Sequence, residues 1–266
     1  MAFMTIAGRA PHPRALLLLS LAGAVLFFGG WHLLVATGAV SAETLPSPVT
    51  VLATAWRLAF EPFAGHTLLE HILASLGRFA MGFLLAAAIG VPLGLAMGRF
   101  PLLDDIVSPI FEALRFIAPL AWVPFAALWF GTGIGGPVMV IFAGAFPPCL
   151  INAYRGAKLV ELRLVEAAQT LGAGGLRIMA EVLLPGALPS IVAGLRVSAG
   201  LAWQSLVGAE LIVASAGVGY VMVQAQSNLA PAIVMAGMLS VGAIGLAIDV
   251  ALRRAERLVR ARWGQA

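Results

Sequence analysis

Residues 72–98 read ILASLGRFAMGFLLAAAIGVPLGLAMG, an apolar stretch with one charged residue, Arg78. A helix of this length rises about 40 Å, enough to cross the ~30 Å hydrocarbon core of a bilayer. Small residues recur within it at every fourth position: Gly82, Ala86, Gly90, Gly94 and Gly98. Residues four apart share one helix face, and small side chains there let a second helix approach closely. The stretch therefore predicts a membrane-spanning helix that packs against another helix along this face.

The composition of the whole chain also indicates a membrane protein. Of its 266 residues, 61% are hydrophobic and only 11% are charged, and the mean hydropathy is +0.99. A soluble domain carries about 25% charged residues, so this chain would leave a large apolar surface in water. These values exclude a soluble enzyme and a disordered chain, and the single cysteine, Cys149, excludes an intrachain disulfide scaffold. We predict an all-α integral membrane protein.

Six apolar stretches predict six transmembrane helices. They cover residues 15–40, 72–98, 106–130, 138–153, 187–212 and 230–252. A cleaved signal peptide is the alternative for the first, because Val40-Ser41-Ala42 resembles a peptidase site, but this apolar run exceeds the ~15 residues of a signal sequence. Residues 41–71 are too polar to span, and the amphipathic segment 49–60 predicts a short helix on the outer membrane surface.

The distribution of basic residues gives the expected orientation. With six spans both termini lie on one side, and twelve of the 16 lysines and arginines fall on that side. The opposite side holds only Arg57, while Arg78, Arg115 and Arg196 lie within or at the ends of spans. Lys and Arg are enriched in cytoplasmic loops, so we expect cytoplasmic termini and a cytoplasmic loop over 154–185. The same clustering beside spans argues against nucleic-acid binding.

These elements predict three parts of the chain. Residues 1–71 would hold the N-terminal transmembrane helix and a segment on the periplasmic surface. Residues 72–253 would form a five-helix core that includes the loop 154–185, and residues 254–266 would be a basic cytoplasmic tail.

The loop 154–185 lies between the fourth and fifth spans and is the only long charged loop. It contains the run Glu166–Gly172 (EAAQTLG) and, nine residues later, Val182–Pro185 (VLLP). The composition predicts a helix over 159–171 that stops at Gly172, then a second short helix over 174–183 ended by Pro185. This helix–turn–helix predicts a rigid handle for a partner protein, and the alternative is an ordinary solvated loop.

The loop pattern resembles the EAA signature of the permease subunits of bacterial ABC importers, with Val182 where isoleucine is usual. Further motifs along nearly the whole chain resemble the nitrate/sulfonate/taurine branch of that family. They are Leu45–Pro48 (LPSP), Ser75–Arg78 (SLGR), Pro92–Gly98 (PLGLAMG), Ala118–Pro124 (APLAWVP), Trp129–Gly131 (WFG), Gly194–Val197 (GLRV), Gly208–Leu211 (GAEL) and Gly217–Gly219 (GVG).

The resemblance implies a non-catalytic subunit of the bacterial inner membrane that forms the translocation path for a small solute. Two copies of a separate ATP-binding subunit would dock on the loops, a second permease chain would pair with this one as a homodimer, and a periplasmic binding protein would deliver the solute. The chain has no Gly-x-x-x-x-Gly-Lys-Ser/Thr motif for ATP, and no cofactor is expected. The implied ATPase-coupling residues are Glu166, Ala167, Ala168, Gly172, Val182, Leu184 and Pro185.

Members of this branch carry nitrate, taurine or alkanesulfonates, and a pyrimidine or another aromatic metabolite is the alternative solute. An ion-coupled secondary transporter is the alternative from another class, but it calls for inverted repeats and deeply buried carboxylates. An intramembrane enzyme calls for a nucleophile–base pair, and the chain has no Gly-x-Ser-x-Gly or His-Glu-x-x-His motif.

Ionisable residues within spans predict further sites, because charges are unfavourable in lipid. Arg196, Trp203 and Glu210 recur every seven residues and share one helix face, and with Gln204 they are candidates to line the path. The alternative for Arg196 and Glu210 is anchoring at the two membrane surfaces. Arg78 is expected to extend its side chain to the outer surface.

Two short-range ion pairs are also expected, Glu112 with Arg115 and Asp249 with Arg253, because residues three or four apart meet on a helix. The four histidines, His12, His32, His66 and His71, have no metal-ligand spacing, so no metal site is expected.

Overall fold

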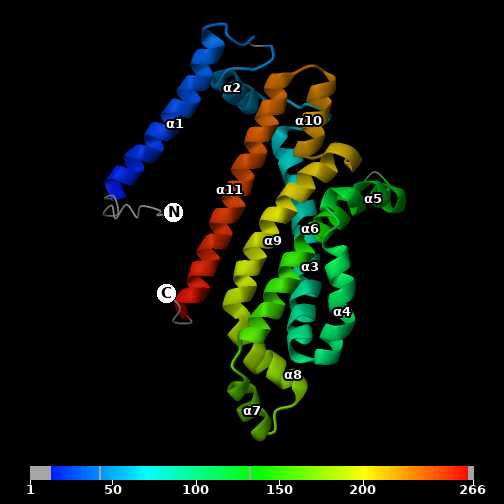
Figure 1. Cartoon of the computed structure of the whole chain (residues 1–266). Helices are drawn as coiled ribbons and strands as arrows, with labels where there is room; N and C mark the ends of the chain where they lie inside the picture. Colours follow the sequence, from blue (N-terminus) through cyan, green and yellow to red (C-terminus); the bar gives the residue numbers. More distant parts are fainter. Residues whose placement is uncertain (1–12, 42, 132, 263–266) are drawn as a thin grey trace, which may run out of the picture.

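The computed structural model of this protein describes residues 13–41, 43–131 and 133–262, and this part of the chain contains helices and turns but no strand (Figure 1). In chain order the helices are α1 (Pro13–Ala36), α2 (Pro48–Leu58), α3 (Leu68–Arg99), α4 (Pro101–Leu114), α5 (Val123–Phe130), α6 (Gly135–Leu159), α7 (Leu162–Thr170), α8 (Gly175–Ile178), α9 (Leu184–Val213), α10 (Val218–Ser227) and α11 (Pro231–Arg262). A 3₁₀ turn, η1 (Pro119–Trp122), precedes α5, and a π-helical turn, η2 (Met179–Leu183), precedes α9. The expectations for residues 1–12 and 263–266 lie outside the described residues.

Five helical segments are long and apolar enough to cross a membrane, and they confirm five of the six predicted spans. They are Leu18–Ala36 in α1, α3, α6, the continuous helix Gly175–Val213 and Pro231–Ala261 in α11. α11 continues without a break to Arg262, so the expected basic tail is a helical extension of the last span over its described part. The all-α membrane fold is thereby confirmed.

The remaining predicted span, residues 106–130, is wrong as one straight helix. α4 ends at Leu114, and it meets the segment Pro119–Phe130 at a bend of 87°. Ala118 has ψ 138°, outside the helical region, because the ring of a following proline disfavours the helical conformation. The bent pair is either one broken span or a re-entrant structure, which gives the described chain five or six crossings.

The centre of the fold is formed by α3, α6 and α9, and the small-residue face of α3 lies directly on α6. A Cβ atom added to Gly82 would lie 2.6 Å from Cγ2 of Ile141, and one added to Gly90 would lie 2.9 Å from Cβ of Cys149. Real Cβ atoms do not approach this closely, so only glycine fits the observed helix separation. The predicted close packing along this face is therefore confirmed.

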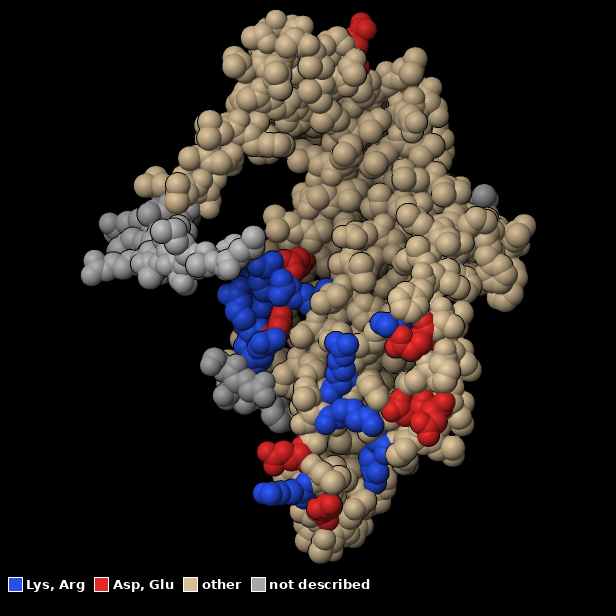
Figure 2. Space-filling model, viewed as in Figure 1, with Lys and Arg blue, Asp and Glu red and all other residues tan. Residues whose placement is uncertain are grey.

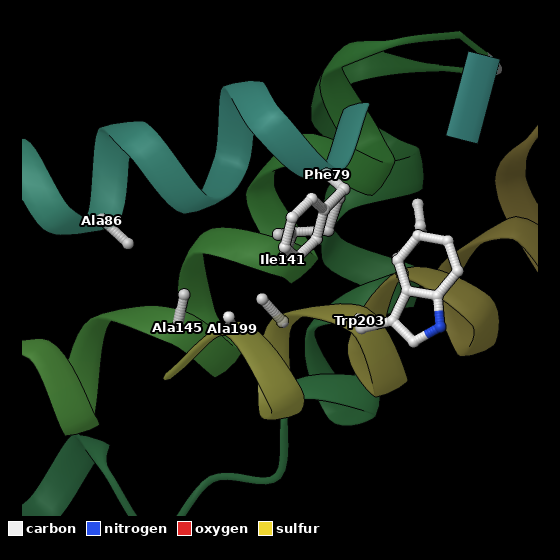
Figure 3. Close-up of a cluster of buried hydrophobic side chains, with 8 residues drawn as sticks. Phe79, Ala86, Ile141, Ala145, Ala199 and Trp203 are labelled. Atoms are coloured by element: carbon white, nitrogen blue, oxygen red, sulfur yellow. The ribbon is translucent and has the colours of Figure 1, made fainter. Parts of the chain in front are cut away.

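Small residues continue across the interface between α6 and α9. Ala86 of α3, Ala145 of α6 and Ala199 of α9 are fully buried in one cluster with Phe79, Ile141 and Trp203, which Figure 3 shows between the three helices. Phe79 meets Trp203 edge to face, with ring centroids 5.6 Å apart. Aromatic and alanine side chains therefore share one buried cluster between α3, α6 and α9.

α2 confirms the short amphipathic helix predicted over 49–60. The Ser47 hydroxyl caps its start by accepting a hydrogen bond from the Thr50 backbone N–H at 3.2 Å. Val51 and Leu58 are buried in a cluster with residues of α10 and α11, whereas Trp56 on the other face is 72% exposed. α2 lies at the end of the bundle opposite α7 and α8 (Figure 1).

The glycine face of α3 yields a prediction with a matched control on the same helix. A Cβ at Gly94 would overlap the backbone oxygen of Leu150 and lie 2.9 Å from the Tyr154 nitrogen, whereas one at Gly77 meets nothing within 4 Å. Gly77→Ala should be neutral or slightly stabilising, because alanine favours a helix by ~1 kcal/mol. Gly94→Ala should destabilise the protein by about 1–3 kcal/mol, since the α6 backbone must move away. The measurement is the melting temperature of each detergent-purified variant, and equal values for the two would contradict this packing.

Candidate functional site

The segment 161–185 projects from one end of the bundle as α7, a turn, α8 and η2, and it leads directly into α9 (Figure 1). A small core of its own holds it together: Val165, Ile178 and Leu183 are buried against one another. Ala168, Ala173 and Val182 surround this core and are partly buried. The segment is therefore a folded unit rather than an extended loop.

The turn after α7 depends on Gly172, which has φ +79°. The Ala173 N–H donates to the Ala168 carbonyl and the Gly172 N–H donates to the Gln169 carbonyl, both at 2.9 Å. This pair of bonds is a Schellman helix ending, and it requires a left-handed residue at the glycine position. No other atom lies within 4 Å of a Cβ at Gly172, so the backbone conformation, and not space, demands glycine. The predicted helix stop at Gly172 is confirmed.

The predicted end of the second short helix at Pro185 is wrong. Residues 175–213 form one continuous helix that passes through Pro185. In the π-helical turn η2, the Leu184 N–H donates to the carbonyl of Met179, five residues back. Pro185, which has no N–H to donate, directly follows this wider turn as the second residue of α9. The part of segment 161–185 from Gly175 onward is consequently continuous with the membrane span in α9.

The expected coupling residues fall into two groups by exposure. Glu166 and Ala167 are exposed on α7, whereas Ala168 and Val182 contribute to the small core, and Pro185 is half-buried at the start of α9. Leu184, at the same junction, is 39% exposed. Two large apolar side chains at the tip are almost fully exposed, Leu171 at 88% and Leu176 at 83%. The described part of this segment therefore carries both exposed apolar side chains and the exposed Glu166.

The expected path residues on α9 do not share one environment. Trp203 is only 6% exposed, and its indole Nε1–H donates to the Val241 carbonyl of α11 at 3.0 Å. Arg196 ties the same two helices through Asp249 at 2.8 Å and Glu256 at 3.2 Å. Gln204 alone lies on an exposed face of α9, which it shares with Val197 (56% exposed). In the single chain Trp203 is thus packed against α11, whereas Gln204 is exposed.

Glu210 and Arg78 form a buried ion pair that sequence reasoning missed. The Arg78 Nη1 atom donates to Glu210 Oε1 at 2.8 Å, and the two side chains are 7% and 1% exposed. The Arg78 side chain, expected to extend outward, is instead buried against Glu210, and Glu210 is buried rather than exposed. The two residues are 132 positions apart, and no local pattern joins them.

The expected short-range pairs are confirmed. Arg115 Nε donates to Glu112 at 2.7 Å, and Arg253 pairs with Asp249. Among the described residues no group of three or more His, Cys, Asp or Glu side chains is arranged to hold a metal ion.

An apolar cavity of about 330 Å³ lies between α3, α4, η1 and α6. Aromatic side chains of Phe111, Trp122, Phe142 and Phe146 line it, and its one charged lining residue, Arg115, is already paired with Glu112. A small hydrophilic solute requires several convergent polar groups, so this cavity does not assign a solute site.

Comparison with known proteins gives the family. Residues 90–264 match the model of the binding-protein-dependent transport system inner membrane component. A putative ABC transporter permease protein of Methanocaldococcus jannaschii is 44% identical over 73% of this chain and 75% of its own length. The taurine transport system permease protein of Escherichia coli is 36% identical over 85% of this chain and 83% of its own length.

The fold also resembles a solved structure. The MetNI methionine ABC transporter in an inward-facing conformation superposes with a TM-score of 0.63 at 20% identity, covering 72% of this chain and 95% of the compared chain. The match to the family model, the identity to its permeases and the helical fold agree. The chain belongs to the family of binding-protein-dependent transport system inner membrane components and is a permease subunit of an ABC importer.

Proposed function

We propose that residues 161–185 dock a separate ATPase subunit and that α9 carries the resulting motion into the membrane. The observation that supports this most directly is the continuous helix Gly175–Val213, which joins the projecting segment to a span without a flexible link. A rigid helix transmits displacement, whereas a loop would absorb it. Because the segment keeps its own small core, it can move as one body.

The exposed surface of this segment has the character of a protein interface. Leu171 and Leu176 are large, apolar and exposed beyond the bundle, and exposed apolar side chains beside polar ones mark contact sites. Glu166 makes no ion pair among the described residues, so its carboxylate is available to a partner's cation. Ala167, with its short side chain, allows a partner backbone to approach.

The absence of a phosphate-binding loop in this sequence supports a separate polypeptide for ATP hydrolysis. A phosphate-binding loop needs lysine directly after glycine, and the one lysine of this chain, Lys158, follows Ala157. We therefore infer an assembly of two ATPase subunits, a second copy of this chain and a periplasmic binding protein. The exposed face of α9 around Gln204 is then the surface available for the path between two permease chains.

We propose that the transported solute is a small molecule that carries an oxyanion group. Relatives of this chain are named for taurine, aliphatic sulfonates, nitrate and bicarbonate, and all of these carry an oxyanion group. Arg78 in α3 and Arg196 in α9 are paired with carboxylates, so we infer that selection rests with the binding protein. A thermal-shift comparison of that protein with taurine, nitrate and a pyrimidine would decide between these solutes and the aromatic alternative.

We also propose that the end of the molecule carrying α7 and α8 faces the cytoplasm. α1 begins and α11 ends toward this same end (Figure 1), and the Lys and Arg side chains on the face shown in Figure 2 lie in its lower half. A positive-inside bias places such an end in the cytoplasm.

This orientation is tested with single cysteines at the two ends. Leu171 and Leu229 are exposed to almost the same extent, 88% and 89%. They follow α7 and α10, which lie at opposite ends of the bundle (Figure 1). The native Cys149 is only 1% exposed, so it should not react with the thiol reagent. In intact cells without the ATPase subunit, a membrane-impermeant maleimide should label Leu229→Cys but label Leu171→Cys only after permeabilisation. The reverse pattern would overturn the orientation.

The docking role is tested with the same substitution at two nearby glycines. Gly172→Ser places a side chain at φ +79° and should disfavour the turn by about 1 kcal/mol or more. Gly174→Ser lies at extended backbone angles before α8 and should be tolerated, because serine is a favoured N-cap. We expect Gly172→Ser and Glu166→Lys to lose most of the co-purified ATPase subunit at equal membrane expression, while Gly174→Ser retains it. Full retention by both glycine variants and by Glu166→Lys would contradict docking at this segment.

The path assignment is tested at Gln204. In the assembled transporter, Gln204→Cys should react with a hydrophilic thiol reagent, and the rate should change on trapping with vanadate. Leu246→Cys on α11, where the native residue is 63% exposed in the single chain, should be unreactive because lipid covers it. Equal and state-independent reactivity at the two positions would mean that Gln204 also faces lipid.

A further inference from the structure

Three separate sequence segments meet around the Glu210 carboxylate at the end of the bundle opposite α7. Ser75 Oγ donates to Glu210 at 2.8 Å, Arg78 Nη1 donates to it at 2.8 Å, and the Gly219 N–H donates to it at 3.0 Å. Ser75 and Arg78 belong to α3, Glu210 to the last turn of α9, and Gly219 to the first turn of α10. One carboxylate therefore joins the outer ends of three helices.

The turn between α9 and α10 is fastened by further bonds to α3. The Val218 N–H donates to Ser75 Oγ at 3.0 Å, the Gly217 N–H donates to His71 Nδ1 at 3.0 Å, and Arg78 donates to the Ala216 carbonyl at 2.6 Å. His71 also bonds the Phe63 carbonyl at 3.0 Å through its other ring nitrogen. The backbone between α9 and α10 is thus held to α3 at successive residues.

Two glycines of this turn are required by its close approach to Glu210. Gly217 has φ +121°, and a Cβ on it would overlap the Glu210 carboxylate oxygens. A Cβ on Gly219 would lie 2.6 Å from Cβ of Glu210. Three sequence motifs that are separate in the chain therefore form one connected arrangement. They are SLGR (residues 75–78), GAEL (208–211) and GVG (217–219).

We propose that Glu210 and Arg78 are positioning residues for transport: they fasten α3, α9 and the start of α10 into one rigid unit at the outer end of the path. This inference rests on the proposed function, because the motion it transmits begins at the docked segment 161–185. Glu210 lies about 39 Å along α9 from Leu184, so the same helix carries the docking segment at one end and this buried pair at the other. Displacement of the inner end then carries the outer unit with it.

An ion pair suits this role better than an apolar contact. In lipid, apolar side chains gain little by choosing one apolar neighbour over another, so they permit sliding between helices. A buried carboxylate with several donors fixed around it loses its partners when any one element shifts. The arrangement therefore favours joint movement of the three helices over their separation.

The test is Glu210→Gln in the complete transporter, with Glu112→Gln as the matched control. Both glutamates pair with an arginine, at 2.8 and 2.7 Å, but Glu112 is 52% exposed and Glu210 is 1% exposed. We expect Glu210→Gln to retain the ATPase subunit and basal ATP hydrolysis. Its uptake, and the stimulation of hydrolysis by the loaded binding protein, should fall at least tenfold, while Glu112→Gln behaves as wild type. Uptake and stimulation by Glu210→Gln within twofold of wild type would overturn the proposal.

A second variant keeps the test decisive if Glu210→Gln does not assemble. The double change Arg78→Met with Glu210→Met removes both charges, and such replacements often preserve stability. We expect this variant to assemble and to hydrolyse ATP without stimulation or uptake, and wild-type uptake by it would overturn the proposal. Failure of the docking role is distinguishable, because Gly172→Ser and Glu166→Lys would then retain the ATPase subunit, whereas failure of this proposal appears as wild-type uptake by the Glu210 variants.

Discussion

The fold depends on the close approach of α3 to α6. In lipid there is no hydrophobic force to press apolar helices together, so association relies on contact between surfaces that fit. Gly82, Gly90 and Gly94 provide this fit, because any side chain there would meet α6 atoms at impossible distances. α9 packs against α3 and α6 through Ala199 and Ala202. This contact positions the segments at the two ends of α9.

The two ends of α9 are held by different physical means. At the Leu184 end, the segment 161–185 is stabilised by a few apolar side chains around Val165 and by a glycine turn, with most of its surface exposed. At the opposite end, Glu210 is buried among donors from α3 and α10. Removal of one partner from a buried ion pair typically costs about 3–5 kcal/mol, a large share of the ~5–15 kcal/mol that stabilises a protein. The exposed end is thus suited to contact a partner, and the Glu210 end is suited to keep its shape.

Features that depend on local pattern were predictable from the sequence, and features that depend on distant partners were not. Long apolar runs gave five spans, the four-residue spacing of glycines gave the packed face of α3, and Gly172 gave the end of α7. The bend before Pro119 was missed because both of its arms are as apolar as a continuous span. The environment of Arg78 was predicted wrongly because its partner Glu210 is 132 residues away, and an arginine near a helix end ordinarily reaches the membrane surface. Pro185 was misplaced because proline also ends helices, and only the π-helical turn before it reveals that the helix continues.

The π-helical turn η2 also bears on how the chain length can vary. A π turn accommodates one extra residue within an otherwise α-helical run while leaving the helices on either side in nearly the same orientation. Elsewhere in the helix Gly175–Val213, removal or insertion of one residue would rotate everything beyond it by about 100°. Within Met179–Leu183, removal of one residue would restore the narrower α-helical turn and bring the ring of Pro185 against the carbonyl four positions before it. The proline that follows this turn therefore fixes the number of residues in it.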